Sequence, residues 1–169
     1  MDVDQCEASG VTRSRRRALV TSGELRRVTR GVFLVGAREV EPAELDQARR
    51  RAAWTALLAY GPGAIAVGKC ALALHGVLGL PVSITPEAAV VRGRDRTDRE
   101  GIRLREFDNG METVEIDGRR VVTVEWALAQ AVPELDRRHA VAVMDSALHL
   151  RLIDEKGLER AHRLARGLP

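Results

Sequence analysis

Aromatic residues and long apolar runs are both scarce in this chain of 169 residues. Only 3% of the residues are aromatic, although 45% are hydrophobic and 30% are charged, so a core has to be built from Leu, Val and Ala. No apolar run approaches the roughly 18 residues that a membrane-spanning helix needs. The first residues include Asp2 and Asp4 and lack the basic start of a signal peptide. We therefore expect a cytoplasmic globular protein with no membrane partner.

Cysteine is equally rare. Cys6 and Cys70 lie far apart, without a CxxC spacing or a neighbouring pair of histidines. Neither a disulfide framework nor a zinc site can be recognised in this spacing. We expect both side chains to be small core residues, and we expect no metal and no cofactor.

Catalytic motifs are also missing, since the chain has no GxGxxG, GxxxxGK[ST], HExxH or GxSxG sequence. One arrangement needs weighing: Asp154-Glu155-Lys156 is a D-x-K triplet with Asp145 upstream. Metal-dependent nucleases use such a triplet on a strand beside another acid. Here it begins a predicted helix, where acids simply favour the helix dipole. We predict that the chain is not an enzyme, with a nuclease as the less favoured alternative.

What the sequence does contain is arginine, unevenly distributed. Lys69 and Lys156 are the only lysines among 27 basic residues. Between Val11 and Gly31, seven arginines and the single acid Glu24 give a net charge of +6, which leaves −3 for the remainder of a chain whose total is +3. This asymmetry predicts a polyanion-binding module attached to a body with another task.

The basic stretch has the outline of two short helices followed by a hairpin. The segments 4–9 and 11–22 are each closed by a glycine, and Thr12 can cap the second. Apolar residues in 25–28 and 32–35 flank a turn before Gly31, which predicts a β-hairpin with an arginine tip. A winged helix-turn-helix has this order, with one helix reading a DNA groove and the wing gripping the backbone. The alternative is a solvated basic surface on an ordinary subdomain.

This interpretation gives each arginine a role. We expect the helix residues to contact the major groove of double-stranded DNA and the hairpin residues to contact phosphate. The helix residues are Arg13, Arg15, Arg16 and Arg17, and the hairpin residues are Arg26, Arg27 and Arg30.

The fold class predicted for the whole chain is α+β. Residues 1–38 would form a winged helix-turn-helix, and residues 39–169 a mixed helix and antiparallel-sheet domain. In that domain we expect helices over 43–60, 69–78, 126–132, 137–150 and 155–166, and a β-rich stretch over 82–124 with a turn at Asp117-Gly118. We expect Arg49, Arg50 and Arg51 to form a solvated helix face, His75 to be a hydrogen-bonded core residue, and residues 92–100 to form an exposed loop.

Several motifs occur in the order found in a known family. Ala8-Ser9-Gly10-Val11, Gly23-Glu24-Leu25-Arg26-Arg27-Val28 and Arg30-Gly31-Val32-Phe33 resemble the N-terminal winged helix of AbiEi-type antitoxins, with Phe33 where that family usually has Tyr. Further matches are Gly61-Pro62-Gly63-Ala64, Ala71-Leu72-Ala73-Leu74-His75-Gly76, the stretch 118–128 and Met144-Asp145-Ser146-Ala147-Leu148.

The resemblance implies a cytoplasmic antitoxin of a type IV toxin–antitoxin (abortive infection) system. Its winged helix would repress its own promoter, and its C-terminal region would counter a nucleotidyltransferase toxin without a stable complex. Family members usually have another helix before the segment matching 4–9, and a related branch carries a nuclease-like domain after the segment matching 157–169. We therefore expect an incomplete winged helix and no enzyme activity.

Two questions about partners stay open at this stage. Related DNA-binding proteins form dimers on palindromic sites, which makes a homodimer an expectation without an assigned surface. The alternative to an autorepressor is an interaction protein whose antitoxic body binds a partner directly while its N-terminal module is vestigial.

Overall fold

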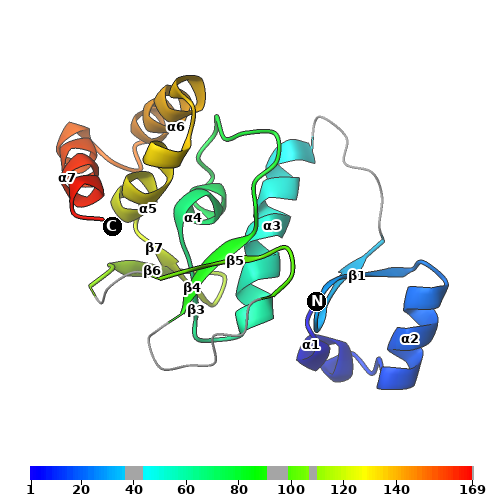
Figure 1. The fold of residues 1–169 in the computed structure, drawn as a ribbon. Coiled ribbons are helices and arrows are strands. Elements are labelled where there is room, and N and C mark those ends of the chain that lie inside the picture. The colour runs from blue at the N-terminus through cyan, green and yellow to red at the C-terminus, as the bar shows by residue number, and fades with distance from the viewer. Residues whose placement is uncertain (37–43, 91–98, 107–109, 169) are drawn as a thin grey trace.

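The structure is a computed structural model that describes residues 1–36, 44–90, 99–106 and 110–168. It has the predicted α+β fold, with a two-stranded and a five-stranded sheet among the described residues (Figure 1). The boundary expected between residues 38 and 39 and the start of the helix expected from Ala43 fall outside the described ranges, as do residues 92–98 of the expected loop.

The N-terminal module consists of two helices and a hairpin in the expected order. Its elements are α1 (Val3–Ala8), α2 (Arg13–Thr21), β1 (Leu25–Thr29) and β2 (Val32–Val35). Each helix has a side-chain N-cap: Asp2 accepts from the Gln5 amide, and Thr12 accepts from the Arg15 amide. The first residues also pair with β2, since the Met1 nitrogen donates to the Phe33 carbonyl and the Phe33 amide donates to the Met1 carbonyl, each at 2.8 Å. This isolated antiparallel bridge, Asp2 with Val32, therefore holds the start of α1 against the hairpin.

The body alternates helices with short strands. Its elements are α3 (Leu45–Tyr60), β3 (Ala64–Ala66), α4 (Gly68–Leu74), β4 (Glu87–Val90), β5 (Arg103–Arg105), β6 (Thr113–Ile116), β7 (Arg119–Val122), α5 (Val124–Ala131), the 3₁₀ turn η2 (Val132–Glu134), α6 (Arg137–His149) and α7 (Glu155–Arg166). The five helices lie close to the predicted ranges.

The five-stranded sheet has the order β5-β4-β3-β7-β6 and is mixed. β3–β4 and β6–β7 are antiparallel, as expected for this domain, whereas β3–β7 and β4–β5 are parallel. Parallel neighbours need a long crossover, which the segment containing α4 provides between β3 and β7. The turn predicted at Asp117-Gly118 is confirmed, and both residues have the positive φ of a tight hairpin.

Val82 and Ile84, which alternate like strand residues, lie in an irregular segment. Pro81 and Pro86 flank them, and proline removes the amide donor that a strand needs. The alternation of apolar and polar residues in this segment therefore predicted a strand that does not form.

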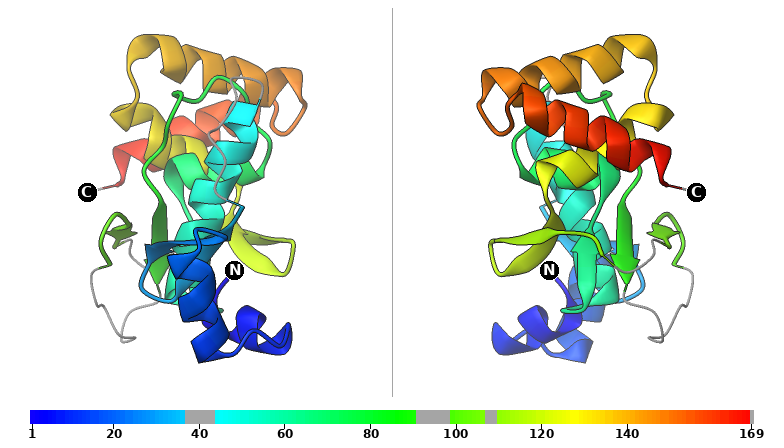
Figure 2. Two further views of the ribbon diagram at one scale, coloured as in Figure 1. Left: turned by 90° about the vertical axis from the view of Figure 1, so that its right-hand side faces the viewer. Right: turned by 90° about the vertical axis from the view of Figure 1, so that its left-hand side faces the viewer.

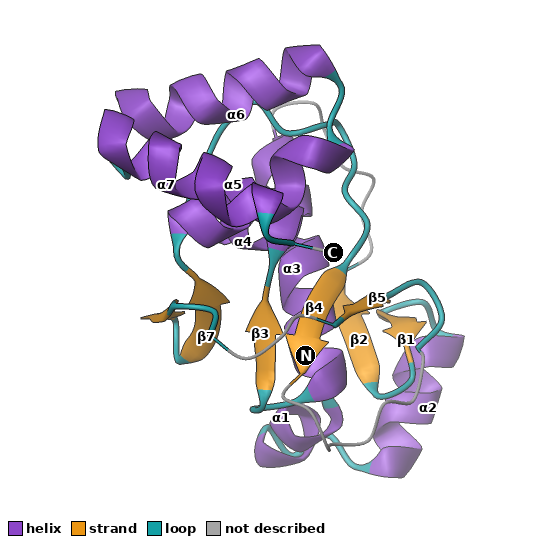
Figure 3. Ribbon diagram, turned by 60° about the vertical axis from the view of Figure 1, so that its left-hand side comes forward, coloured by secondary structure: helices purple, strands orange, loops and turns teal. Residues whose placement is uncertain are grey.

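Helices build up in layers away from the sheet. α3 and α4 pack on the sheet, α5 packs on α4, and α6 and α7 pack on α5. Figures 2 and 3 show α6 and α7 at one end of the molecule and α1 and α2 at the other. The core is rich in Leu, Val and Ala, as the composition predicted, and Val32 of β2 extends it into the N-terminal module. Among the described residues, no helix is long and apolar enough to span a bilayer.

Both cysteines are buried and free, as expected. Burial raises the pKa of the Cys70 thiol to about 12, which keeps it protonated and unreactive. His75 is also a hydrogen-bonded, half-buried residue, because its Nε2 donates to the Val122 carbonyl at 2.7 Å.

The arginines of α3 depart from the expected solvated face. Arg49 donates to the Leu80 and Pro81 carbonyls at 2.7 and 2.8 Å, and its side chain is only 10% exposed. These carbonyls belong to the irregular segment after α4, where no strand partner binds them, so the guanidinium takes that place. Sequence spacing to acids one turn away could not show this contact.

Candidate nucleic-acid interface

A concave groove of about 770 Å³ runs between α2 and the hairpin. Four exposed arginines line it, Arg13 and Arg17 from α2 and Arg27 and Arg30 from the hairpin, over a floor that includes Val3, Val20 and Phe33. We call this feature the arginine groove. The groove thus combines positively charged arginines with apolar side chains, and no Asp or Glu of the described residues lines it.

Local structure brings these four side chains together. Arg13 and Arg17 are four residues apart and share one face of α2. Arg27 is the middle residue of β1, and Arg30 lies in the turn after this strand, where Gly31 has a φ of 81° that glycine adopts without strain. The antiparallel hairpin therefore presents its turn beside the helix, and the groove forms between them.

Arg16 corrects the sequence-based assignment. It is 7% exposed and donates to the Glu7 carboxylate at 3.3 Å and to the Val11 carbonyl at 3.1 Å. These bonds tie α2 to α1 and to the turn between them. Arg16 also lines the groove, but its guanidinium is buried and committed to these acceptors, so we interpret it as a structural residue and not as a DNA contact.

Arg15 and Arg26 are exposed, but they do not line the arginine groove. Arg15 lies on another face of α2, because it is two residues from Arg13 and from Arg17. Arg26 precedes Arg27 on a strand, where successive side chains point to opposite faces. Of the seven predicted arginines, five line the groove, four of them exposed and Arg16 buried, and two lie outside it.

Sequence reasoning missed the floor of the groove. Val20 is 38% exposed on α2, and Phe33 of β2 lines the same surface. The four-residue spacing from Arg13 to Arg17 and on to Thr21, with Val20 beside it, was a signal that could have identified this face.

The exposed arginines of the module have no acid to pair with. Arg13, Arg15, Arg17, Arg26, Arg27 and Arg30 form no ion pair within the part of the chain that the structure describes. Three of the four acids in the described part of the module have other partners, because Glu7 binds Arg16, Asp2 caps α1 and Glu24 accepts from the Ser22 hydroxyl, and the fourth, Asp4 of α1, does not line the groove. The surface therefore keeps its positive charge available for an external anion.

The body also touches the hairpin tip. Arg99 donates from Nη1 to the Arg30 carbonyl at 2.9 Å and lies 5.4 Å from the centre of the Tyr60 ring. This contact holds the backbone of the turn while leaving the Arg30 side chain exposed.

A second charged cluster lies in the body, and its members neutralise one another. Glu134 binds Lys69 and Arg103, each at 2.9 Å, and also binds Arg105, which lies 3.5 Å from the buried Glu87. Burial would raise the pKa of Glu134, but hydrogen bonds from Lys69 and Arg105 outweigh it and lower that pKa to about 2. Burial raises the pKa of Glu87, against the effect of Lys69 and Arg105.

This cluster also depends on a close backbone approach. The Lys69 amide donates to Glu87 at 3.0 Å, and a Cβ at Gly68 would lie 2.5 Å from the Glu87 carboxylate. Glycine is therefore required at the start of α4, where its φ is also positive.

The D-x-K triplet does not form a metal site. The Asp154 carboxylate accepts from the Gly157 amide at 2.7 Å as the N-cap of α7, which is the ordinary role of an acid at a helix start. Asp145 is exposed on α6. No group of three or more His, Cys, Asp or Glu side chains suited to a metal ion occurs among the described residues.

Comparison with known proteins adds no family. No protein-family model matches the chain, and no curated protein matches it at a significant level. The resemblance to AbiEi-type antitoxins therefore rests on the short motifs quoted above.

Proposed function

We propose that the chain binds double-stranded DNA through its N-terminal module and acts as a transcriptional repressor of its own promoter. The observation that carries this proposal is the arginine groove, which four exposed arginines from a helix and a hairpin line and which no acid of the described residues lines. Guanidinium groups bind phosphate oxygens in pairs of parallel hydrogen bonds. A DNA backbone strand is the polyanion whose regular phosphates suit such a channel.

The two walls have different tasks in this proposal. α2 enters the major groove with Arg13 and Arg17, while Arg27 and Arg30 hold the phosphates of the adjoining strand. Arg15 and Arg26 add charge outside the channel. Arg16 supports the module from within, through the turn between α1 and α2.

The antitoxin role comes from the resemblance. We propose that the protein counters a nucleotidyltransferase toxin encoded beside it, as in type IV toxin–antitoxin systems, and that it acts in the cytoplasm without a stable toxin complex. Support comes from two motif residues that have defined places in the fold. Gly31 lies in the hairpin turn, and His75, which follows α4, donates a hydrogen bond to the Val122 carbonyl of β7. Co-expression of the neighbouring toxin with and without this chain tests the role, with restored growth as the expected result.

DNA binding is tested by a mobility shift of the purified chain on its own upstream DNA and on a scrambled duplex of equal length. We expect preferential binding to the upstream DNA, and with the two phosphate contacts of Arg27 and Arg30 it should weaken roughly tenfold between about 50 mM and about 200 mM salt. Equal binding to both duplexes would leave a nonspecific DNA binder. A chain that shifts neither duplex at low salt would contradict the proposal.

A further inference from the structure

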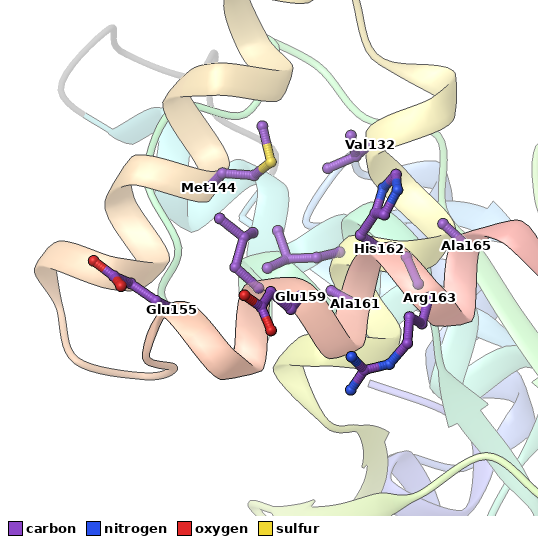
Figure 4. A pocket seen from close by; sticks show the side chains of 11 residues that line it. Val132, Met144, Glu155, Glu159, Ala161, His162, Arg163 and Ala165 are labelled. Atoms are coloured by element: carbon purple, nitrogen blue, oxygen red, sulfur yellow. The ribbon is translucent and has the colours of Figure 1, made fainter.

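A second groove, of about 640 Å³, lies between α5, α6 and α7 at the end of the molecule away from the DNA-binding module (Figures 1 and 4). Its floor is apolar and includes Leu128 and Val132 of α5, Met144 of α6, and Leu158 and Ala161 of α7. We call it the α7 groove. Apolar hollows of this kind are favourable sites for a partner, because closing them removes apolar surface from water.

The charges on the rim of the α7 groove are separated by sign. Glu155 and Glu159 line the half at the start of α7, whereas His162 and Arg163 line the half toward its end, as Figure 4 shows. The helix dipole alone favours acids at a helix start, yet Lys156 stands in the first turn and Arg160 in the middle of α7. Neither of these bases lines the groove. The separation is therefore sharper on the rim than along the helix as a whole.

This arrangement fits a second copy of the same helix. When two α7 helices lie antiparallel about a twofold axis through their middles, the acidic half of one meets the basic half of the other. Glu159 then faces Arg163 of the second copy, and Glu155 faces Arg166. Every pairing occurs twice by symmetry, and a parallel arrangement would set like charges against each other.

We infer that the chain forms a homodimer through an antiparallel pairing of α7 helices over the α7 groove. Leu150 and Leu152, exposed in the connection from α6 to α7, then lie beside the far end of the α7 helix of the second copy and extend the apolar contact. Because α7 and α2 lie at opposite ends of the molecule, both arginine grooves stay open in the dimer. Dimerisation and DNA binding therefore use separate surfaces, so the dimer can be lost while DNA binding is kept.

The test measures the mass of the full chain in solution by sedimentation equilibrium between about 1 and 200 μM. The wild-type chain should be a dimer in this range. Two charge-reversed variants of residues that line the groove, Glu159→Arg and Arg163→Glu, should each raise the dimer dissociation constant roughly tenfold or more, since like charges then face each other twice. Lys156→Glu is the matched control, because that exposed base on the same helix lies off the groove, and it should leave the constant unchanged.

Mixing the two charge-reversed variants tests whether the opposite charges pair between subunits. In a heterodimer of the two charge-reversed variants, both contacts become attractive again, so an equimolar mixture should dimerise as the wild type does. A tag on one variant should retain the other. Thermal melts of each variant show that the chain is folded, so that loss of the dimer cannot be loss of the fold. A wild-type chain that is monomeric throughout, or a mixture that does not recover, overturns the proposal and leaves the α7 groove to a different protein.

Discussion

Most arginines of the N-terminal module differ from a group of arginines in the body that are held by acceptors within the chain. In the body, Arg49 binds backbone carbonyls, Arg103 and Arg105 bind Glu134, and Arg160 binds Glu125. In the module only Arg16 is fixed by an acid and a carbonyl. The remaining six of its seven arginines are exposed and form no ion pair among the described residues, and of these Arg27 donates from Nε to the Thr29 carbonyl at 3.4 Å.

The difference shows that the number of arginines does not locate a binding surface. What matters is whether an acceptor within the chain already satisfies each guanidinium. A paired arginine offers an external anion little net charge, whereas a cluster without acids raises the local potential and attracts phosphate. We therefore expect replacement of the exposed arginines to change DNA affinity, and replacement of the buried or paired basic residues to change stability.

The largest effect should come from removing the exposed arginine side chains of the arginine groove. Replacing Arg13, Arg17, Arg27 and Arg30 by alanine removes two proposed major-groove contacts and two proposed phosphate contacts, so affinity for upstream DNA should fall roughly a hundredfold or more at low salt, and the slope of log affinity against log salt should flatten by about 1.8. Mobility shifts at several salt concentrations measure both. The melting temperature should hardly change, because these side chains are exposed.

Arg15 and Arg26 provide the matched control for that experiment. Their double replacement by alanine removes exposed arginines from the same two elements but leaves the groove intact. We expect a much smaller loss of affinity. If this pair weakens binding as much as the groove residues do, the protein responds to total charge rather than to the channel, and the proposed contact surface is wrong.

Next in size is the effect of Arg16 on folding. Replacing it by alanine leaves the Val11 carbonyl without its side-chain donor and removes the tie to Glu7, which should lower the free energy of unfolding by about 1 to 3 kcal/mol. Chemical denaturation measures this loss. Arg15→Ala on the same helix should be nearly neutral. Equal stability of both variants would mean that the bond between α1 and α2 contributes nothing.

The sequence predicted the local elements better than their long-range relations. Helix caps such as Thr12 and the turn at Asp117-Gly118 act over a few residues, so their chemistry can be recognised in the chain itself. Strand direction cannot, because Ile65 and Arg120 become parallel neighbours only after a crossover that no local pattern specifies.

In the candidate site, too, the local pattern was predictable and the contacts between elements were not. The basic stretch was evident from the charge distribution, but the separate places of Arg16, Arg15 and Arg13 depend on how α2 is rotated against α1 and the hairpin. Arg16 occupies a position where charge would ordinarily face water, and its burial follows from two acceptors, Glu7 and the Val11 carbonyl. Those acceptors come from a different element, so helical periodicity alone could not identify the inward face.

A smaller effect is expected from Glu134, which joins three bases of the body. Its pKa is lowered to about 2, so its stabilising contribution is present above its ordinary value of 4.5 and is lost as the pH falls toward 2. The variant Glu134→Gln should melt at a lower temperature than the wild type at neutral pH, and the gap should close on acidification. Melting curves between about pH 7 and pH 2 measure it. A gap that is constant with pH would mean that the loss is one of packing and not of charge.

The smallest effect should come from His75, whose nitrogen is satisfied by a backbone carbonyl instead of an acid. Burial lowers its pKa below the ordinary value of 6.5, against the opposing effects of the Val122 carbonyl and Glu125. The unfolded chain therefore binds a proton more readily than the folded one, and stability should fall as the pH drops below 6.5. In His75→Gln, which keeps an amide donor but does not titrate, this fall should be absent, so the difference in melting temperature between the two proteins should shrink from about pH 7 to pH 5. A difference that grows instead would mean that attraction to Glu125 exceeds the effect of burial, and His75 would then belong with the paired bases of the body.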